Sequence, residues 1–167
     1  SALRRDETIA KLTNVMPVDK PQDLYQYVAD ISTKEMIYRA DSGSNDWCQR
    51  FVDHWGTLKR KVVKRATMCD AYGITPHGIR KYAREEGHLN WVPEKFGKKV
   101  LAASVNELTA LTIHGPNGAM EESNKGKDYV RYISDLYSIV NRPMTWNVPG
   151  GFHVVNRYIE FEPKVSR

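Results

Sequence analysis

The chain has 167 residues, of which 41% are hydrophobic, so it can bury a core, and wholesale disorder is excluded. Lys and Arg number 25 against 20 Asp and Glu, and this formal charge of +5 supports an anionic partner such as nucleic acid or nucleotide only weakly. Cys48 and Cys69 form neither a CxxC motif nor a Cys/His quartet, which argues against a zinc site or a disulfide scaffold and favours a reducing compartment. Without an apolar run of membrane-spanning length or a signal peptide, the sequence predicts a soluble, intracellular protein.

The first predicted helix covers residues 2–11 and begins without a leading loop or a capping residue. Because a domain usually starts with a few loosely held residues, this start suggests that the chain was cut from something longer. A helix that starts early after removal of the initiating Met stays open as the alternative. Asn14-Val-Met-Pro17 then predicts a stop, and Asp19, with proline soon after it, is the expected N-cap of a helix through residues 22–28.

The next predicted elements, in chain order, are a polar surface loop about 39–46, an amphipathic helix over 47–54, a helix over 58–71 and a shorter helix over 79–86. Gly73, Pro76 and Gly78 separate the last two helices. A further helix is predicted over residues 98–113, where Val100, Leu101, Val105, Leu108 and Leu111 form an apolar stripe that indicates core packing.

The C-terminal third changes character after this helix. The tract His114-Gly-Pro-Asn-Gly118 is expected to end it, and another helix is predicted over 127–140, with Ile133 and Leu136 in the core. Residues 144–158 predict a turn and a strand. The sequence therefore predicts a mainly α fold with a small β element near the C-terminus, in a single domain over residues 1–167.

The predicted helix over 58–71 carries the chemistry. Five of the seven residues in Lys59-Arg-Lys-Val-Val-Lys-Arg65 are cationic, and Arg60, Lys64, Met68 and Tyr72 follow at steps of four, so they share one slowly rotating helix face. An Arg and a Lys one turn apart repel each other, but they can divide the oxygens of a polyphosphate between them. The face grades from charged to apolar and aromatic, as a nucleoside triphosphate does from phosphates to sugar and base. On spacing alone, a solvated basic face with Tyr72 as a core aromatic stays open as the alternative.

This segment resembles a motif of a known family. Arg60-Lys-Val-Val-Lys-Arg-Ala-Thr-Met-Cys-Asp-Ala-Tyr-Gly73 is similar to motif B of the single-subunit RNA polymerases of phages and mitochondria, Arg-x3-Lys-x3-Met-x3-Tyr-Gly on the nucleotide-binding helix of the fingers. Family A DNA polymerases share this frame but typically carry Phe or Tyr where Met68 stands, so the methionine favours the RNA-synthesising branch.

Further segments resemble the same family in the right order and extend the resemblance over nearly the whole chain. They are Ser1-Ala-Leu-Arg-Arg-Asp-Glu7 with Asn14-Val-Met-Pro17 after palm motif A, Pro21-Gln-Asp-Leu-Tyr-Gln-Tyr-Val-Ala29 in the next helix, Gly73-Ile-Thr-Pro-His-Gly78 after motif B, and Trp146-Asn-Val-Pro-Gly-Gly-Phe-His-Val-Val155 ahead of the promoter-specificity loop. The resemblance implies a multi-helix fingers subdomain of a right-hand polymerase, lying between palm motif A and that loop.

The resemblance also implies roles at the incoming nucleotide. Arg60 and Lys64 would bind the triphosphate, and Lys64 could protonate the pyrophosphate leaving group. Met68 would belong to the same NTP-binding face. Tyr72 would sit beside the sugar and sense the 2′-hydroxyl, because a site built around a hydroxyl penalises the analogue that lacks it.

Four further residues would lie at the template or the DNA. Gly73 would let the template base approach the backbone, since a Cβ would stand in its way. Arg65, His77 and Gly78 would lie near template or downstream DNA, although this chain has His77 where relatives often place an aromatic or aliphatic residue.

The resemblance further implies Mg²⁺ as the cofactor of the complete enzyme, held by carboxylates around the 3′-hydroxyl and the α-phosphate. In the family these are a palm aspartate just before the position of Ser1 and a second in a downstream His-Asp-Ser motif, and neither occurs in this sequence. Asp6, Asp70 and Asp128 stand in no such motif and are interpreted as surface or local structural acids. The chain alone is therefore expected to contain no metal site and to be inactive.

The predicted function is part of a DNA-dependent RNA polymerase. Its expected partners are NTPs, the DNA template, the RNA product, and the missing palm and thumb segments or a complementary polymerase subunit, with no membrane. The expected location is the cytoplasm of a phage-infected bacterial cell, with a virion or an organelle as alternatives. A fragment of a family A DNA polymerase stays open, as does a free-standing helix-turn-helix domain in which Arg80, Lys81 and Arg84 reach a groove or phosphates.

Overall fold

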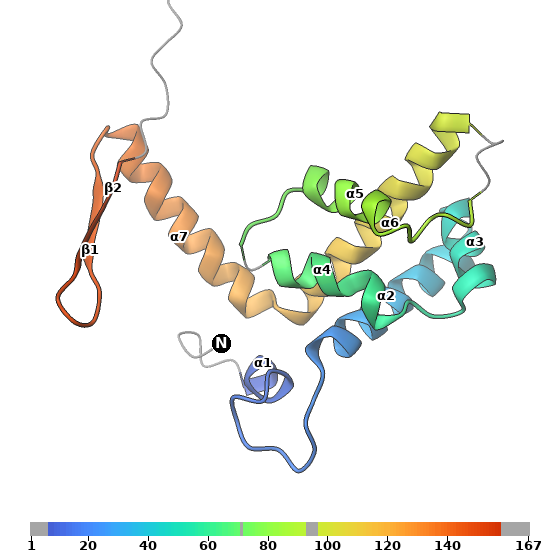
Figure 1. Cartoon of the computed structure of the whole chain (residues 1–167), viewed down its shortest axis with the longest axis horizontal. Coiled ribbons are helices and arrows are strands. Elements are labelled where there is room, and N and C mark those ends of the chain that lie inside the picture. The colour runs from blue at the N-terminus through green and yellow to red at the C-terminus, as the bar shows by residue number, and fades with distance from the viewer. Residues whose placement is uncertain (1–6, 71, 93–96, 158–167) are drawn as a thin grey trace, which may run out of the picture. The chain divides into compact units, whose positions relative to one another are not determined.

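The computed structural model describes residues 7–70, 72–92 and 97–157, and its contacts divide the chain into two compact units, Ser1–Glu122 and Ser123–Arg167 (Figure 1). The helices of the first unit are α1 (Glu7–Leu12), α2 (Leu24–Asp41), α3 (Asp46–Trp55), α4 (Arg60–Asp70), α5 (Pro76–Glu85) and α6 (Gly97–Ala119). Helix α7 (Glu121–Ile139) begins at the boundary, and the strands β1 (Met144–Asn147) and β2 (His153–Asn156) follow it. The predicted mainly α fold with a small C-terminal β element is confirmed, whereas the single-domain assignment stays a prediction.

Helix α2 begins later than predicted, because Asp23 and not Asp19 caps it. Asp23 is extended, and its Oδ1 accepts hydrogen bonds from the backbone N–H groups of Tyr25 at 2.9 Å and Gln26 at 3.3 Å. Gln22 cannot join the helix, since the side chain of Asn14 bonds both its N–H (2.8 Å) and its carbonyl oxygen (3.0 Å). The prediction of Asp19 as N-cap is therefore wrong.

The polar loop expected about 39–46 narrows to residues 42–45. Helix α2 continues to Asp41, and the hydroxyls of Ser42 and Ser44 both donate to the carbonyl oxygen of Arg39 at 3.1 Å. Asn45 then caps α3 by accepting a hydrogen bond from the backbone N–H of Trp47 at 2.8 Å. Side-chain capping at both ends thus confines the loop to four residues.

Helix α6 runs through the tract that was expected to end it, so that prediction is wrong. Gly115 and Pro116 are buried inside the helix, and Gly115 lies against Val28 and Ser32 of α2. A Cβ at Gly115 would clash with the hydroxyl of Ser32 and lie 2.8 Å from the carbonyl oxygen of Val28. Ser32 also donates a hydrogen bond to the carbonyl oxygen of Leu111 at 3.0 Å. The glycine therefore permits a close approach of α2 and α6, and that packing outweighs its poor helix propensity.

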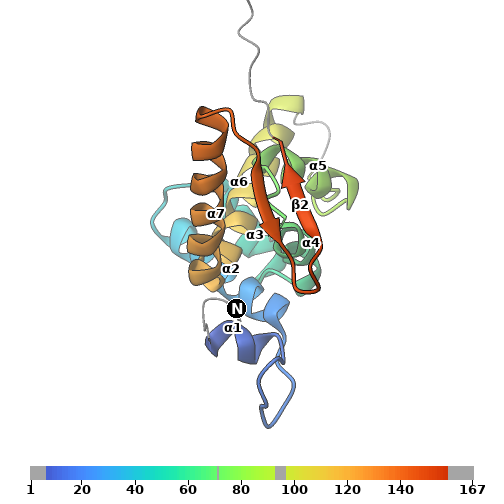
Figure 2. The same cartoon turned by 90° about the vertical axis from the view of Figure 1, so that its left-hand side faces the viewer.

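Helix α4 lies beside α2 and α6 in both Figure 1 and Figure 2, and it contributes to two clusters of buried side chains. Val62 belongs to the larger cluster and Val63 to the smaller one. The larger cluster contains Met36, Cys48, Phe51, Leu58, Val62, Ala83, Leu89, Val92, Val105, Leu108 and Leu111. The smaller one contains Ile9, Val28, Ala29, Val63, Ala119 and Met120. Burial of adjacent residues in separate clusters fixes the rotation of α4 about its axis.

The predicted core positions are only partly right. Val105 and Leu108 are buried, but Leu101 is 38% exposed and Leu136 is 41% exposed. Apolar periodicity marks a face of a helix, but it does not show which part of that face a neighbouring element covers.

A buried acid joins three helices of the first unit. Glu107 on α6 accepts hydrogen bonds from Arg39 Nη1 at 2.9 Å, Asn45 Nδ2 at 2.7 Å and Cys48 Sγ at 3.2 Å. Burial raises the pKa of the Cys48 thiol to about 12, and the hydrogen bond to Glu107 acts in the same direction. Cys48 is therefore a protonated structural group at neutral pH, as befits a thiol outside any metal or redox motif.

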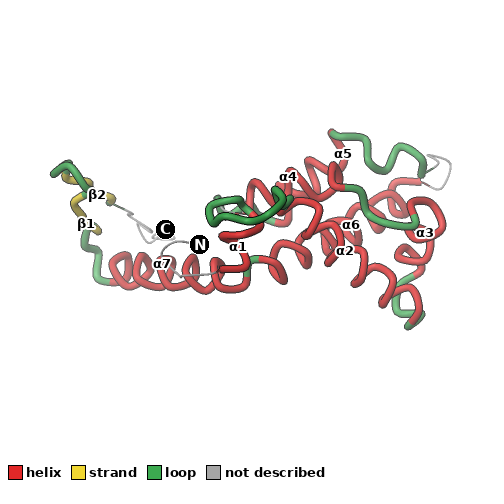
Figure 3. The backbone as a smooth tube through the Cα atoms, turned by 90° about the horizontal axis from the view of Figure 1, so that it is seen from below, coloured by secondary structure: helices red, strands yellow, loops and turns green. Residues whose placement is uncertain are grey.

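The second unit contains an antiparallel hairpin, which pairs Thr145 with Val155 and Trp146 with Val154. Figure 3 shows these strands after the long helix α7. Gly150 and Gly151 in the turn have φ values of 104° and 82°, a region that glycine adopts without strain. The expected turn and strand are confirmed, and the turn brings a second strand with it.

Candidate nucleotide-binding site

Helix α4 has one buried and one exposed side, and the candidate site lies on the exposed side. Its buried residues are Val62, Val63, Ala66 and Thr67, and its exposed residues are Arg60, Lys61, Lys64, Arg65 and Met68. At 1.5 Å per residue, the line from Arg60 to Met68 extends about 12 Å along the axis. The packing of the opposite side thus presents three of the four predicted NTP-binding residues in a row to solvent.

The first residues of α2 contact both cations of this row. Arg60 Nε donates to Asp23 Oδ2 at 2.6 Å, and its Cζ lies 5.0 Å from the centre of the Tyr25 ring. Lys64 Nζ lies 5.9 Å from the same ring. The face of an aromatic ring attracts cations, so Tyr25 favours the juxtaposition of Arg60 and Lys64 despite their like charge.

Asp23 stays ionised in this arrangement. Its limited burial raises the pKa of the carboxyl, but the hydrogen bonds from Arg60, Gln26 and Tyr25 outweigh that effect and hold the pKa below its ordinary value. The carboxylate is therefore charged at neutral pH and binds Arg60 as an ion pair.

Met68 is the apolar end of the row, and Tyr72 follows in the turn beyond α4. Met68 is 49% exposed and Tyr72 is 91% exposed, so the alternative that Tyr72 is a core aromatic is wrong for this structure. The backbone N–H of Tyr72 bonds the carbonyl oxygen of Cys69 at 3.0 Å, which holds the residue just beyond the helix end.

Gly73 closes this turn with a φ of 72°, and its N–H bonds the carbonyl oxygen of Asp70 at 2.9 Å. A Cβ there would meet nothing within 4 Å. Within the described chain the glycine is therefore required by its backbone conformation and not by crowding.

Arg65 points away from the row, toward α5 and the turn that follows it. Its Nη1 donates to Glu86 Oε1 at 3.0 Å, and its Cζ lies 3.7 Å from the centre of the Tyr82 ring. The hydrogen bond to Glu86 raises the pKa of the guanidinium above its ordinary value. Arg65 thus joins α4 to the end of α5, and the structure does not bring it together with Arg60 and Lys64.

His77 and Gly78 lie in the first turn of α5. Thr75 caps this helix, accepting a hydrogen bond from the N–H of Gly78 at 3.2 Å, and Pro76 is the first helical residue. His77 is exposed, while a Cβ at Gly78 would lie 3.0 Å from Cγ1 of Ile74. A larger residue at position 78 would therefore press on Ile74.

Sequence reasoning missed Asp23 and Tyr25 as partners of the site. The only signal was the Gln-Asp-x-Tyr pattern within Pro21-Gln-Asp-Leu-Tyr25, which resembles a family segment without indicating a role. The two residues lie more than 30 positions before α4, so only the packing of α2 against α4 brings them to Arg60 and Lys64.

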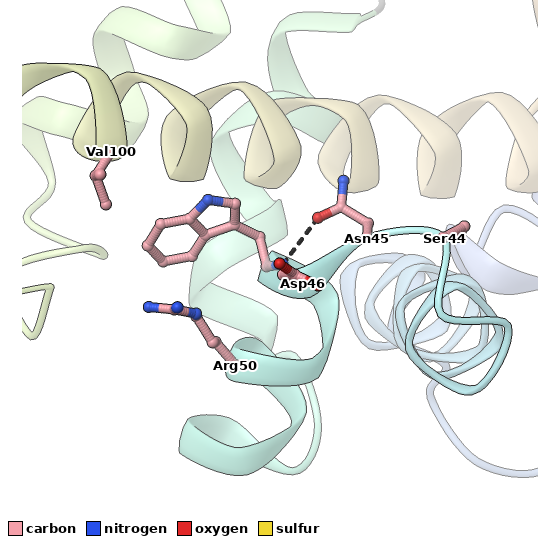
Figure 4. A pocket seen from close by; sticks show the side chains of 6 residues that line it. Ser44, Asn45, Asp46, Arg50 and Val100 are labelled. Carbon is pink, nitrogen blue, oxygen red and sulfur yellow. Dashed lines mark hydrogen bonds between the residues drawn. The ribbon is translucent and has the colours of Figure 1, made fainter.

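A separate cavity of about 440 Å³ lies between the start of α3 and the start of α6 (Figure 4). Asn45, Asp46 and Arg50 come from the α3 side, and Val100 comes from α6. The Cζ of Arg50 lies 5.0 Å from the centre of the Trp47 ring, which also lines the cavity. None of the predicted site residues is among the side chains that line it.

Neither a metal site nor a membrane span occurs in the described ranges. No three His, Cys, Asp or Glu side chains there gather closely enough to hold a metal ion, so these residues do not fit the magnesium ions that the resemblance implies. Over the same part of the chain, every helix is too short or too polar to cross a lipid bilayer.

Comparisons with known proteins agree on one family. A model of DNA-dependent RNA polymerase matches residues 1–166. The chain is 30% identical over 169 residues to "DNA-directed RNA polymerase 1B, mitochondrial" of Nicotiana tabacum, an alignment that covers 95% of this chain and 16% of that protein. Over 162 residues it is 29% identical to "DNA-directed RNA polymerase, mitochondrial" of Homo sapiens, covering 95% of this chain and 12% of that protein.

Another relative is "DNA-directed RNA polymerase 2A" of Nicotiana tabacum, 29% identical over 169 residues, of which the alignment covers 48%. The chain thus spans less than half of the length of each of these relatives. The family model and the relatives' names favour RNA polymerase over a family A DNA polymerase and over a free-standing helix-turn-helix domain. On this match over nearly its whole length, the chain belongs to the DNA-dependent RNA polymerase family.

Proposed function

We propose that this chain supplies the nucleotide-binding helix of the fingers in a single-subunit DNA-dependent RNA polymerase. Arg60 and Lys64 bind the triphosphate of the incoming NTP, Met68 lies along the nucleotide, and Tyr72 senses the ribose. The observation that carries the proposal is the exposed row on α4, where Arg60, Lys64 and Met68 grade from two cations to an apolar side chain, with the exposed aromatic Tyr72 in the turn just past the helix end.

The arrangement suits the chemistry of nucleotidyl transfer. Two cations one turn apart can neutralise adjacent phosphates, and the preorganised charge of Lys64 stabilises the negative charge that develops on the leaving group. Lys64 can in addition deliver a proton to the departing pyrophosphate, whereas Arg60 holds its proton too tightly for that role.

The template side of the site is proposed for the other predicted residues. Gly73 has no Cβ, so a template base can approach its backbone. Arg65, His77 and Gly78 face template or downstream DNA. Magnesium belongs to the proposed complete enzyme, with its ligands outside the described residues.

NTPs, the DNA template, the RNA product and the palm and thumb are the proposed partners. The location in a phage-infected bacterial cell stays a prediction. The mitochondrial and chloroplastic names of relatives support the organelle alternative.

The triphosphate assignment is tested by replacing Arg60 with alanine in the complete polymerase. The KM for the incoming NTP should rise about ten-fold or more, because a charge-assisted hydrogen bond to a phosphate is lost. The affinity for template DNA, measured by fluorescence anisotropy, should stay within about two-fold, because the hydrogen bond that is lost is assigned to the nucleotide and not to the DNA. The matched control is Lys34→Ala, which removes an exposed cation from α2 outside the row. An unchanged KM in Arg60→Ala, or an equal rise in Lys34→Ala, would contradict the proposal.

The ribose assignment is tested by Tyr72→Phe, which removes only the hydroxyl. The preference for ribo- over deoxyribonucleotides, measured as the ratio of kcat/KM values, should fall about five-fold, the worth of one neutral hydrogen bond. Tyr38→Phe serves as the control, since Tyr38 is an exposed tyrosine of α2 outside the row. If the ratio stays the same in Tyr72→Phe, the tyrosine is not the sensor.

A further inference from the structure

The carboxylate of Asp23 makes two kinds of contact at once. Its Oδ1 caps α2 by accepting from the N–H groups of Tyr25 and Gln26, and its Oδ2 accepts from Arg60 Nε at 2.6 Å. The hydrogen bonds to α2 thus fix the carboxylate of Asp23 in place, and this fixed carboxylate binds Arg60.

The geometry of the Arg60 contact leaves most of the guanidinium for another acceptor. A guanidinium carries five N–H donors, and the bond through Nε uses one of them. The Tyr25 ring lies 5.0 Å from Cζ of the same group. An exposed arginine side chain usually samples many rotamers. Here a carboxylate and an aromatic ring from the start of α2 hold the side chain of Arg60 in one orientation.

We infer that Asp23 is a positioning residue, which holds Arg60 in the orientation that receives the triphosphate of the incoming nucleotide. This inference rests on the proposed function, since it gives Arg60 its phosphate role. It excludes two other roles for the contact. In one, Asp23 acts only as a helix cap. In the other, its carboxylate competes with the phosphates for Arg60.

The substitution Asp23→Asn separates the cap from the ion pair. Asparagine is as good an N-cap as aspartate, but it removes the negative charge from the partner of Arg60. In the complete polymerase we expect the KM for the incoming NTP to rise about three-fold, in the range of an exposed ion pair. The value of kcat should change little, because Arg60 binds the triphosphate alike before and during the reaction. Thermal stability should match that of the unaltered enzyme.

Two further variants make the test specific. Asp23→Ser also keeps a capping oxygen but is too short to reach Arg60, so it should reproduce the rise in KM. In an Arg60→Ala background, Asp23→Asn should have no additional effect on KM, because residues that act through one another are not additive.

The outcomes distinguish this inference from the proposed function. A KM that rises in both Asp23 variants, but not further in the Arg60→Ala background, supports it. Three outcomes overturn the inference. An unchanged KM in the Asp23 variants indicates that Asp23 acts only as a helix cap, and a lower KM indicates that its carboxylate competes with the phosphates. A rise in KM that persists in the Arg60→Ala background indicates that Asp23 affects KM by a route other than Arg60. If Arg60→Ala itself leaves the KM unchanged, the proposed function fails, whereas a rise in Arg60→Ala without one in the Asp23 variants refutes the positioning role alone.

Discussion

Replacing Lys64 with alanine in the complete polymerase is expected to slow single-nucleotide addition by about a hundred-fold or more, the usual cost of losing a proton donor or a preorganised charge. Binding of template DNA should change little, because the row on α4 is assigned to the nucleotide. Addition rates come from rapid-quench measurements on a halted elongation complex, and DNA affinity from anisotropy.

The fold itself should tolerate this substitution. Lys64 is exposed, while the neighbouring Val63 is buried in the smaller cluster and anchors the helix. Alanine has the highest helix propensity, so α4 should keep its structure. A lost rate therefore reports on the site and not on unfolding.

The variant Lys64→Arg separates charge from proton transfer. Arginine keeps the positive charge but does not release a proton in proteins, so the KM should stay close to normal while kcat falls. The control is Lys34→Ala, which should keep the full rate. Unaltered addition in Lys64→Ala would refute the assignment, and full activity of Lys64→Arg would refute the proton-donor role alone.

Replacing Gly115 with alanine is expected to lower the free energy of local unfolding of α2 and α6 by about 2 kcal/mol, as overpacking does in other cores. The new methyl group would clash with the hydroxyl of Ser32 and lie 2.8 Å from the backbone carbonyl oxygen of Val28. The hydroxyl can rotate, but the carbonyl can move only with α2.

Hydrogen exchange of the amides in both helices measures this loss. The control lies one turn away in the same helix: a Cβ at Gly118 would lie 3.4 Å from Cγ2 of Ile31, an ordinary contact. Gly118→Ala should therefore be neutral, or stabilising by up to about 1 kcal/mol through better helix propensity. Equal protection in the two variants would contradict the close approach assigned to Gly115.

The exposed row of the site could be predicted from the sequence because it is local. A step of four residues places Arg60, Lys64 and Met68 on one face of any helix, and the intervening Val62 and Val63 indicate the buried side. The same locality explains why the turn and one strand near the C-terminus could be predicted, whereas the second strand of the hairpin was not.

What could not be predicted depends on packing between distant segments. The pairing of Asp23 with Arg60 requires the angle and distance between α2 and α4, which no local pattern encodes. The tract with Gly115 and Pro116 carries the local signals of a helix end, yet burial against α2 keeps it helical. Similarly, Asp19 and Asp23 are both suitable caps by type, and the hydrogen bonds of Asn14 to Gln22 decide between them.

The central claim, that the exposed row on α4 receives the triphosphate, is tested most directly by affinity labelling. A halted elongation complex would be treated with the complementary adenosine nucleotide whose phosphate chain ends in an aldehyde, and borohydride reduction would fix any Schiff base to a nearby lysine. Peptide mapping should find the label mainly on Lys64, suppressed by excess NTP and lost in Lys64→Arg. Labelling that falls on a lysine outside α4, or equally on Lys61 and Lys64, would contradict the account.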